Sequence, residues 1–191
     1  MNTEYEIRIL GINKEEFVKK IKSMGAKHIG DFFPRRYVYD LIPKEEHKWL
    51  RLRTNGYDTT LTIKEIKKQS IDSTKELEIT VDDFDKTNLL LESLGFKNKG
   101  YQENKRSEYI LDNIHIDIDK WPMIPEYVEL EGLNKKDVIN IIKKLGYQEK
   151  DCVALGVSAI YTHYGYDGEN LKDLNFDMEK DSKWFLCFRV L

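Results

Sequence analysis

Charged and apolar residues alternate strictly along several segments of this 191-residue chain. In residues 4–9, glutamate and arginine occupy every second position, and tyrosine and isoleucine occupy the positions between them. Because successive side chains of a strand point to opposite faces, each such segment has one ionic face and one apolar face. The alternation predicts strands in segments 4–10, 37–41, 49–54, 59–66, 75–81, 106–111, 115–119 and 127–131.

Helical periodicity separates some of these strands, and each longer helical segment is followed by a glycine. The first helix is expected after Asn13, whose spacing to Glu16 is that of a capping box, and it ends before Gly25. Short turns such as Asn55-Gly56 join most neighbouring strands, so the sheet is expected to be largely antiparallel. The other expected helices cover about 85–94, 134–145 and 158–164.

The overall charge balance excludes several classes of partner. Lysine and arginine number 31 against 34 aspartates and glutamates, which leaves a net charge of −3. This balance argues against bulk attraction to nucleic acid or to a membrane. Cys152 and Cys187 have no metal-binding spacing and are expected to be free thiols in a reducing cytoplasm. We expect no signal peptide and no transmembrane span, and therefore a cytoplasmic location.

The ionic faces of the expected strands carry a full charge at nearly every position. One interpretation is an open sheet whose charges are solvated and paired across strands. The other is a barrel in which these faces line a charged lumen. Buried bases are costly unless an anion neutralises them, and buried carboxylates are costly unless a metal ion or those bases neutralise them. A triphosphate bound with Mg²⁺ or Mn²⁺ would meet both requirements. No glycine-rich phosphate loop is present, and side chains are therefore expected to bind the phosphates.

The first of these strands also carries a known signature. Glu4-x-Glu6-x-Arg8 resembles the ExExK motif of the CYTH superfamily, the group of class IV adenylyl cyclases and thiamine triphosphatases also called triphosphate tunnel metalloenzymes. The resemblance covers about residues 2–165 and implies an α+β fold. That fold is an eight-stranded antiparallel β tunnel, closed or nearly closed, with flanking helices. The further motifs follow in order as Leu50-Arg51-Leu52-Arg53, Leu61-Thr62-Ile63-Lys64, Glu76-x-Glu78, Lys105-Arg106, Asp117 with Asp119, and Glu129-x-Glu131.

The resemblance implies a role for each charged position of these motifs. The carboxylates expected to bind Mg²⁺ or Mn²⁺ are Glu4, Glu6, Glu129 and Glu131. The bases expected to bind phosphate are Arg8, Arg51, Arg53, Lys64, Lys105 and Arg106. The acidic residues expected to act in catalysis, as further ligands or by positioning water, are Glu76, Glu78, Asp117 and Asp119.

Two positions depart from the family pattern. The third signature residue is Arg8 instead of lysine, and an arginine cannot give up its proton to act as a base. Water activation would then fall to the metal. The segment Arg35-Arg36-Tyr37-Val38-Tyr39-Asp40 keeps Tyr39 and Asp40 but has an arginine at an earlier position where the family often has aspartate. The additional base at that end implies a different substrate tail.

Three functions remain open at this stage. The favoured one is metal-dependent hydrolysis of inorganic triphosphate or of a nucleoside or thiamine triphosphate. The alternative is a class IV adenylyl cyclase that converts ATP to cyclic AMP and pyrophosphate, and the third is a non-catalytic binder of triphosphate or polyphosphate. The expected partner is a small-molecule triphosphate, with a homodimer left open. Residues 1–165 are expected to form the tunnel domain, and residues 166–191 a C-terminal extension that packs as an extra strand or plug.

Overall fold

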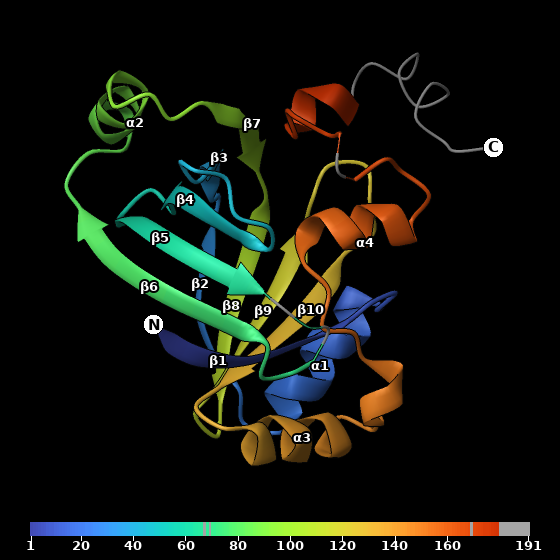
Figure 1. Cartoon of the computed structure of the whole chain (residues 1–191). Coiled ribbons are helices and arrows are strands. Elements are labelled where there is room, and N and C mark those ends of the chain that lie inside the picture. Colours follow the sequence, from blue (N-terminus) through green and yellow to red (C-terminus); the bar gives the residue numbers. More distant parts are fainter. Residues whose placement is uncertain (67, 69, 169, 180–191) are drawn as a thin grey trace.

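The computed structural model describes residues 1–66, 68, 70–168 and 170–179 (Figure 1). Its ten strands form one antiparallel sheet in the order β2-β8-β9-β10-β1-β6-β5-β4-β3-β7. The strands are β1 (Asn2–Ile9), β2 (Lys27–Phe32), β3 (Arg35–Asp40), β4 (Lys48–Thr54), β5 (Thr59–Ile66), β6 (Thr74–Val81), β7 (Asn98–Glu103), β8 (Lys105–Leu111), β9 (Ile114–Lys120) and β10 (Tyr127–Gly132). All eight strands expected from the alternation are present.

The fold agrees with the expected antiparallel tunnel with flanking helices, but the sheet has ten strands instead of eight, and its hydrogen-bonded order is open, with β2 and β7 at its two ends. These two strands were not expected, since glycines interrupt their polar sequences at positions 30 and 100. Only residues 33–34 separate β2 from β3, and only Asn104 separates β7 from β8. The Asn104 N–H donates to the Pro34 carbonyl at 3.0 Å. The chain therefore links the two halves of the sheet where the order is open.

Strand β1 joins the two halves at the opposite side of the molecule. Its first residues, Asn2 to Glu4, pair with β6, and its remaining residues, Tyr5 to Ile9, pair with β10. The Glu6 N–H leaves the ladder with β6 and donates to the Ile71 carbonyl at 3.0 Å. This change of partner carries one ionic face from one half of the sheet to the other.

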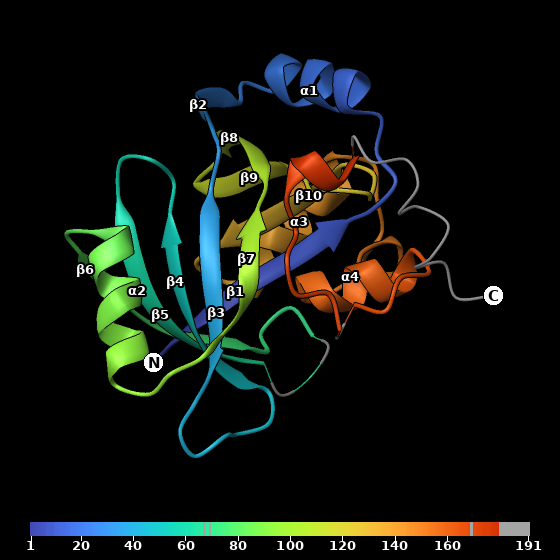
Figure 2. The ribbon, with the colours of Figure 1, turned by 90° about the horizontal axis from the view of Figure 1, so that it is seen from above.

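Four α-helices cover the apolar faces of the sheet in the described residues. They are α1 (Lys14–Ser23), α2 (Phe84–Ser93), α3 (Lys135–Lys144) and α4 (Val157–His163), and short 3₁₀ helices cover Glu149–Asp151 and Phe176–Glu179. Seen from above, α2 lies at the left beside β4 and β5, α1 lies at the top and α4 lies at the right (Figure 2). Since the helices take the apolar faces, the ionic faces turn toward one another.

The buried apolar residues form three clusters. The largest packs β1 and β8–β10 against α1 and α3, with Ile116 and Ile142 completely buried. A second cluster lies under α2 around Tyr39 and Leu52. The third joins the end of β9 to α4 and contains Trp121. Burial of each large side chain contributes roughly 1.5–3 kcal/mol, so these clusters hold the strands against the helices.

The local signals for helix ends are confirmed. Asn13 caps α1 by accepting a hydrogen bond from the Glu16 N–H at 3.2 Å, and Gly25 follows α1 with φ +95°. Such a φ lies in the left-handed region, which glycine adopts at little cost. The turn at Asp112 and Asn113 also has positive φ at both residues, as a tight hairpin between β8 and β9 requires.

The described part of the C-terminal extension returns to the sheet. Leu174 is buried in the third cluster, its N–H donates to the Tyr101 carbonyl, and its carbonyl accepts from Glu103. Residues 180–191, which include Cys187 and the last part of the segment expected to form an extra strand or plug, lie outside the described residues. No helix in the described ranges is both long and apolar enough to cross a membrane.

Gly132, at the end of β10, provides a test of the packing between β9 and α3. A Cβ atom there would overlap Ile114 Cδ1 and lie 2.9 Å from Val138 Cγ2. We expect Gly132→Ala to lower the free energy of unfolding by about 1–3 kcal/mol, because both neighbours are already tightly packed.

Urea denaturation followed by circular dichroism measures this change. The control is Gly156→Ala, since an added Cβ at Gly156 meets no atom within 4 Å. Its φ of −67° also suits alanine. Equal stability of the two variants would contradict the packing described here.

Candidate active site

The ionic faces of the two halves of the sheet face one another across a shared space, which we call the lumen. The Lys64 ammonium on β5 lies 3.3 Å from Glu4 Oε2 and 3.7 Å from Glu6 Oε1 on β1. These side chains are buried or nearly so, with Glu6 and Lys64 only 4% and 8% exposed. The interpretation of an open, solvated charged face is therefore wrong, and the lumen is confirmed.

One end of the lumen, the carboxylate end, consists of Glu4, Glu6, Glu76 and Glu131 around Lys64. The Lys64 ammonium makes its shortest contact, 2.5 Å, with Glu76 Oε1. Burial raises the pKa of Glu4 to about 8, and the neighbouring carboxylates add to this against the attraction of Lys64. Burial and nearby carboxylates likewise raise the pKa of Glu131. Arg8 also pairs with Glu6 and Arg51 with Glu76, but Glu131 has no ion pair in the described residues, so this end has more acid than base.

Arg8 lies in the middle of the lumen and holds two strands together. Its Nη2 contacts Glu6 at 3.1 Å and forms a close ion pair with Glu129, while its Nη1 donates to the Leu155 carbonyl at 2.6 Å. Although burial opposes both charges, the Arg8 and Arg106 guanidinium groups hold the pKa of Glu129 well below its usual range. Arg8 thus contacts two carboxylates and a carbonyl.

The other end of the lumen, the arginine end, consists of Arg36, Arg53 and Arg106, with Arg51 next to them. Arg106 is well compensated, because it lies 2.5 Å from Asp117, 2.7 Å from Asp119 and 3.4 Å from Glu129. Arg51 contacts Glu76 and Glu78 at 3.6 and 3.7 Å, and Arg53 reaches Glu78 only at 4.0 Å. Arg53 therefore has a weaker ion pair than Arg51 or Arg106.

Arg36 has the least compensation of these bases. It is 6% exposed, and no carboxylate in the described ranges lies within ion-pair distance of it. It donates instead to the neutral Asn104, and its guanidinium carbon lies 4.5 Å from the centre of the Trp121 ring. Burial and the neighbouring Arg51, Arg53 and Arg106 lower the pKa of Arg36 to about 9. The arginine end therefore has surplus positive charge.

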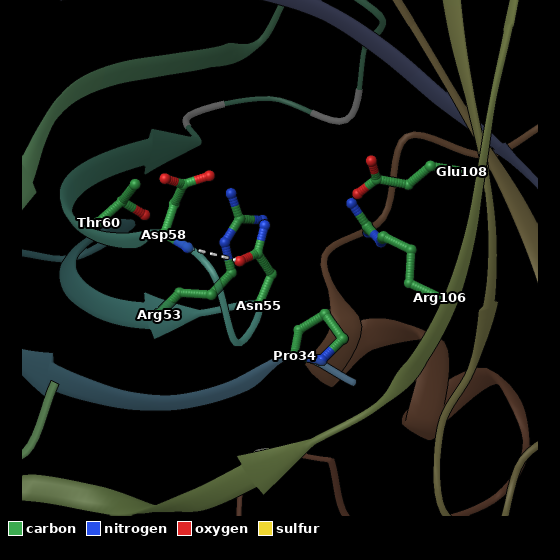
Figure 3. A pocket seen from close by; sticks show the side chains of 7 residues that line it. All are labelled: Pro34, Arg53, Asn55, Asp58, Thr60, Arg106 and Glu108. Carbon is green, nitrogen blue, oxygen red and sulfur yellow. Dashed lines mark hydrogen bonds between the residues drawn. The ribbon is translucent and has the colours of Figure 1, made fainter. Parts of the chain in front are cut away.

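A small cavity of about 70 Å³ opens at the arginine end. Figure 3 shows Arg53 and Arg106 reaching toward it from opposite sides, with the β4–β5 turn held by the bond from the Asp58 N–H to Asn55 Oδ1. This volume has room for a few water molecules or one small polar group. The lining residues are Pro34, Arg53, Asn55, Asp58, Thr60, Arg106 and Glu108.

Seven buried side-chain atoms in the described residues lack a hydrogen-bond partner, and all belong to residues that line or adjoin the lumen. Glu76 Oε1 among them is nevertheless ion-paired with Lys64. Buried polar groups are normally paired, and their concentration in one place indicates a polar ligand. The atoms are Arg8 Nε, Arg36 Nε, Arg51 Nε, Thr60 Oγ1, Glu76 Oε1, Asp117 Oδ1 and Trp121 Nε1.

The structure brings together all the sequence-predicted site residues except one. Lys105 is exposed and lies over the Phe176 ring at 4.6 Å, on the opposite side of β8 from Arg106. The reason is the alternation itself, because neighbours in a strand point to opposite faces. Asn104 had no expected role, and Arg36 was noted only as a departure from the family pattern. The two-residue alternation could have predicted that Trp121 faces the lumen, because it follows Asp117 and Asp119 at the same spacing.

The chemistry of the carboxylate end fits a hard divalent cation. Carboxylate oxygens are the ligands that Mg²⁺ and Mn²⁺ prefer, and the surplus negative charge would be neutralised by such an ion. Across the described residues, no three acidic, cysteine or histidine side chains converge on one point. Lys64 lies among the carboxylates instead. Glu4, Glu6 and Glu131 are the residues that would hold the ion.

The fold is thus an antiparallel β tunnel whose buried lumen has acid at one end and base at the other. The comparison with family models gives the particular family. The CYTH domain model matches residues 2–154, and the chain belongs to this family.

Relatives and solved structures agree with this assignment. A Methanocaldococcus jannaschii protein named "Putative adenylate cyclase" is 26% identical over 163 residues, covering 78% of this chain and 93% of its own. The PH1012 protein of Pyrococcus horikoshii is 26% identical with a TM-score of 0.70, covering 80% of this chain and 96% of its own. A Hippeastrum adenylyl cyclase homologue, described as having a dominant triphosphatase activity, shares the fold at 13% identity and a TM-score of 0.58, covering 86% and 96%.

Arg8 provides a test of how the lumen is held together. Replacing it with methionine leaves Glu6 and Glu129 buried without their shared counter-charge. We expect Arg8→Met to lower the free energy of unfolding by about 3–5 kcal/mol. The double variant with Glu129→Gln should recover part of this loss, because it removes one of the stranded charges.

Chemical denaturation of the single and double variants measures the coupling. Arg35→Met serves as the control, because Arg35 is exposed and contacts only the face of Phe84 among the interactions described. Its effect should stay below about 1 kcal/mol. If Arg8→Met were as mild as the control, Arg8 would not be the group that joins these strands.

Proposed function

We propose that the chain catalyses divalent-metal-dependent hydrolysis of inorganic triphosphate or of an organic triphosphate bound in the lumen. The observation that carries the proposal is the opposite imbalance of charge at the two ends. The carboxylate end has more acid than base, and the arginine end has Arg36 without a carboxylate partner in the described residues. A chain of phosphoryl groups with a bound cation matches this arrangement along its length.

Membership of the CYTH family supports an enzymatic role. Members of the family are enzymes of the triphosphatase or adenylyl cyclase type. Their substrates share a triphosphate, and the lumen offers Arg51, Arg53, Lys64 and Arg106 to its oxygens. Guanidinium forks bind phosphate oxygens in pairs, so these bases both orient the substrate and absorb charge that develops on the leaving group.

In the proposed mechanism Glu4, Glu6 and Glu131 would hold the cation, which when bound would supply charge stabilisation and an activated water. Glu129 was also expected to bind metal, but its contacts with Arg8 and Arg106 favour a role in positioning those bases. Asp119 likewise orients Arg106.

Asp117 is the candidate group to accept a proton from the attacking water. Burial raises its pKa to about 7, because the nearby carboxylates add to the effect of burial and Arg106 opposes it only in part. Its Oδ1 has no hydrogen-bond partner and is therefore available. Arg8 cannot fill this role, since a guanidinium does not release its proton near neutral pH.

Adenylyl cyclase activity is the alternative, favoured by the name of the Methanocaldococcus relative. In that reaction the 3′-hydroxyl of ATP attacks the α-phosphorus and releases pyrophosphate. A cyclase must also hold adenine and ribose, and the cavity at the arginine end is small and lined mainly by polar residues. We therefore favour the triphosphatase, and a non-catalytic triphosphate binder remains the third candidate.

An activity screen separates the three functions. Purified protein is incubated with Mg²⁺ or Mn²⁺ and either tripolyphosphate or ATP, and orthophosphate, pyrophosphate and cyclic AMP are followed. We expect orthophosphate from tripolyphosphate, no cyclic nucleotide, and loss of turnover when the metal is chelated. Cyclic AMP as the main product would establish the alternative, and tight binding without turnover would establish the third.

Glu6→Gln tests the metal assignment within the same screen. The amide keeps an oxygen that can accept from Thr74, so the fold should persist, but it removes a charged metal ligand. We expect turnover to fall by at least about a hundredfold. Glu15→Gln is the control, because Glu15 is exposed in the first turn of α1. Normal turnover by Glu6→Gln at unchanged metal concentration would remove Glu6 from the metal site.

A further inference from the structure

Strand β6 is paired on both sides along only part of its length. On one side the whole strand, Thr74 to Val81, pairs with β5. On the other side β1 pairs only with Thr74 to Glu76. From Leu77 to Val81 this second side, which we call the free edge, has no partner strand in the described residues, and Figure 1 shows it at the outside of the molecule. The backbone N–H and C=O groups along such an edge can pair with another strand.

The side chains that point outward along the free edge are apolar and exposed. Leu77 and Ile79 are 53% and 55% exposed. Their ladder partners on β5, Ile63 and Leu61, pack against the cluster under α2. The apolar cover of this face therefore reaches β5 but leaves Leu77 and Ile79 in contact with solvent.

Helix α2 adds exposed leucines beside them. Asn88 accepts a hydrogen bond from the Tyr39 hydroxyl at 2.6 Å, so the flank of α2 that carries Asn88 faces β3. Leu90 and Leu94 lie on the opposite flank, because successive side chains are about 100° apart around a helix. That flank faces β5 and β6, and the two leucines are 60% and 65% exposed. Exposed apolar side chains gathered in one region mark an interaction surface.

The free edge lacks the features that normally keep exposed strands apart. Proteins protect such edges with lysine, proline or a β-bulge. Residues 77–81 read Leu-Glu-Ile-Thr-Val, and their pairing with β5 runs without a shift of register. The single charge, Glu78, points into the lumen, where it contacts Arg51 at 3.7 Å. This segment is therefore suited to pairing with a further strand.

The same five residues are symmetrical in character about Ile79. Leu77, Ile79 and Val81 share the outer face of the sheet, and the two residues between them share the lumen face. A two-fold contact joins one surface to itself, so it requires a segment that is complementary to its own reverse. In an antiparallel pair centred on Ile79, Leu77 would lie opposite Val81 of the second copy. On the lumen face, Glu78 would lie opposite Thr80.

Charge favours this register over its two neighbours. A pair centred on Thr80 would place Glu78 opposite Asp82 of the other copy. A pair centred on Glu78 would place two glutamates opposite each other. Like charges directly opposite each other are destabilising. Of these three registers, the one centred on Ile79 alone avoids such a contact.

We propose that two copies of the chain associate through an antiparallel pair of β6 strands, with the two-fold axis at Ile79, so that their sheets join into one. This association is independent of the proposed function, because Leu77, Ile79 and Val81 point away from the lumen. A pair of five-residue strands is small beside the roughly 1,200–2,000 Å² of a stable interface. We therefore expect a dimer that dissociates on dilution, with a dissociation constant on the order of 1–100 µM.

Sedimentation equilibrium of the full chain measures this association. The concentration is raised from about 1 to about 200 µM, which spans the expected dissociation constant. We expect the mass to rise from that of one chain toward that of two. The mass of a single chain at every concentration overturns the proposal, whatever other segment or partner protein then pairs with the free edge.

Ile79→Lys tests the interface itself. It removes the apolar contact at the axis and places two ammonium groups there, so dimerisation should weaken at least about tenfold. Because Ile79 is more than half exposed, the variant should keep the circular dichroism of the wild type. The control is Leu133→Lys, since Leu133 is 87% exposed and lies between β10 and α3. Equal dimerisation by the two variants places the interface elsewhere and overturns the proposal.

Cysteine substitutions test the register, and they remain informative if Ile79→Lys does not fold. In a background with Cys152→Ser and Cys187→Ser, Ile79→Cys would place two thiols opposite each other, within the about 4.4–6.8 Å between Cα atoms that a disulfide spans. Leu77→Cys would place them four residues apart along the pair, about 13 Å, which is too far. We expect oxidation to give a covalent dimer from Ile79→Cys and none from Leu77→Cys. Any other pattern overturns the proposal.

Discussion

The structure depends on how a buried set of charges is neutralised. Arg106 pairs with Asp117 and Asp119, and Arg8 pairs with Glu6 and Glu129, so much of the buried charge is balanced within the chain. Buried charges without partners are expensive, and a fold of this kind is stable only if most of them are paired. Carboxylates at the carboxylate end and guanidinium groups at the arginine end are left without full neutralisation. The proposed function follows from this opposite excess of charge at the two ends.

The fold supplies the frame in which this balance is possible. Apolar faces of the strands pack under α1, α2 and α3, which leaves the ionic faces no place except the interior. Strand β1 changes partner along its length, and Asn104 links β7 to β8. Asn104 also accepts from Arg36 and donates to Asp119 at 3.0 Å. One residue therefore serves both the course of the chain and the arrangement of charges.

Two-residue alternation was sufficient to predict eight strands and which side chains share a face, because both depend only on local geometry. It placed Arg106 in the lumen, and the same rule should have excluded Lys105. The strands β2 and β7 escaped notice because their glycines and polar residues carry no clear period. Whether an ionic face would be solvated or enclosed depends on contacts between distant segments, which alternation alone does not contain. The pairing of Arg8 with Glu129 and the lack of an ion pair at Arg36 depend on such contacts between distant segments, so the sequence did not predict them.

The most direct test of the account is a crystal structure of the full chain grown with Mn²⁺ and tripolyphosphate, in which anomalous scattering locates the metal. The account predicts manganese bound by Glu4, Glu6 and Glu131, with the phosphate chain extending from there to the arginines. Manganese and phosphate found only on the exterior, with Lys64 still seated among its glutamates, would contradict it.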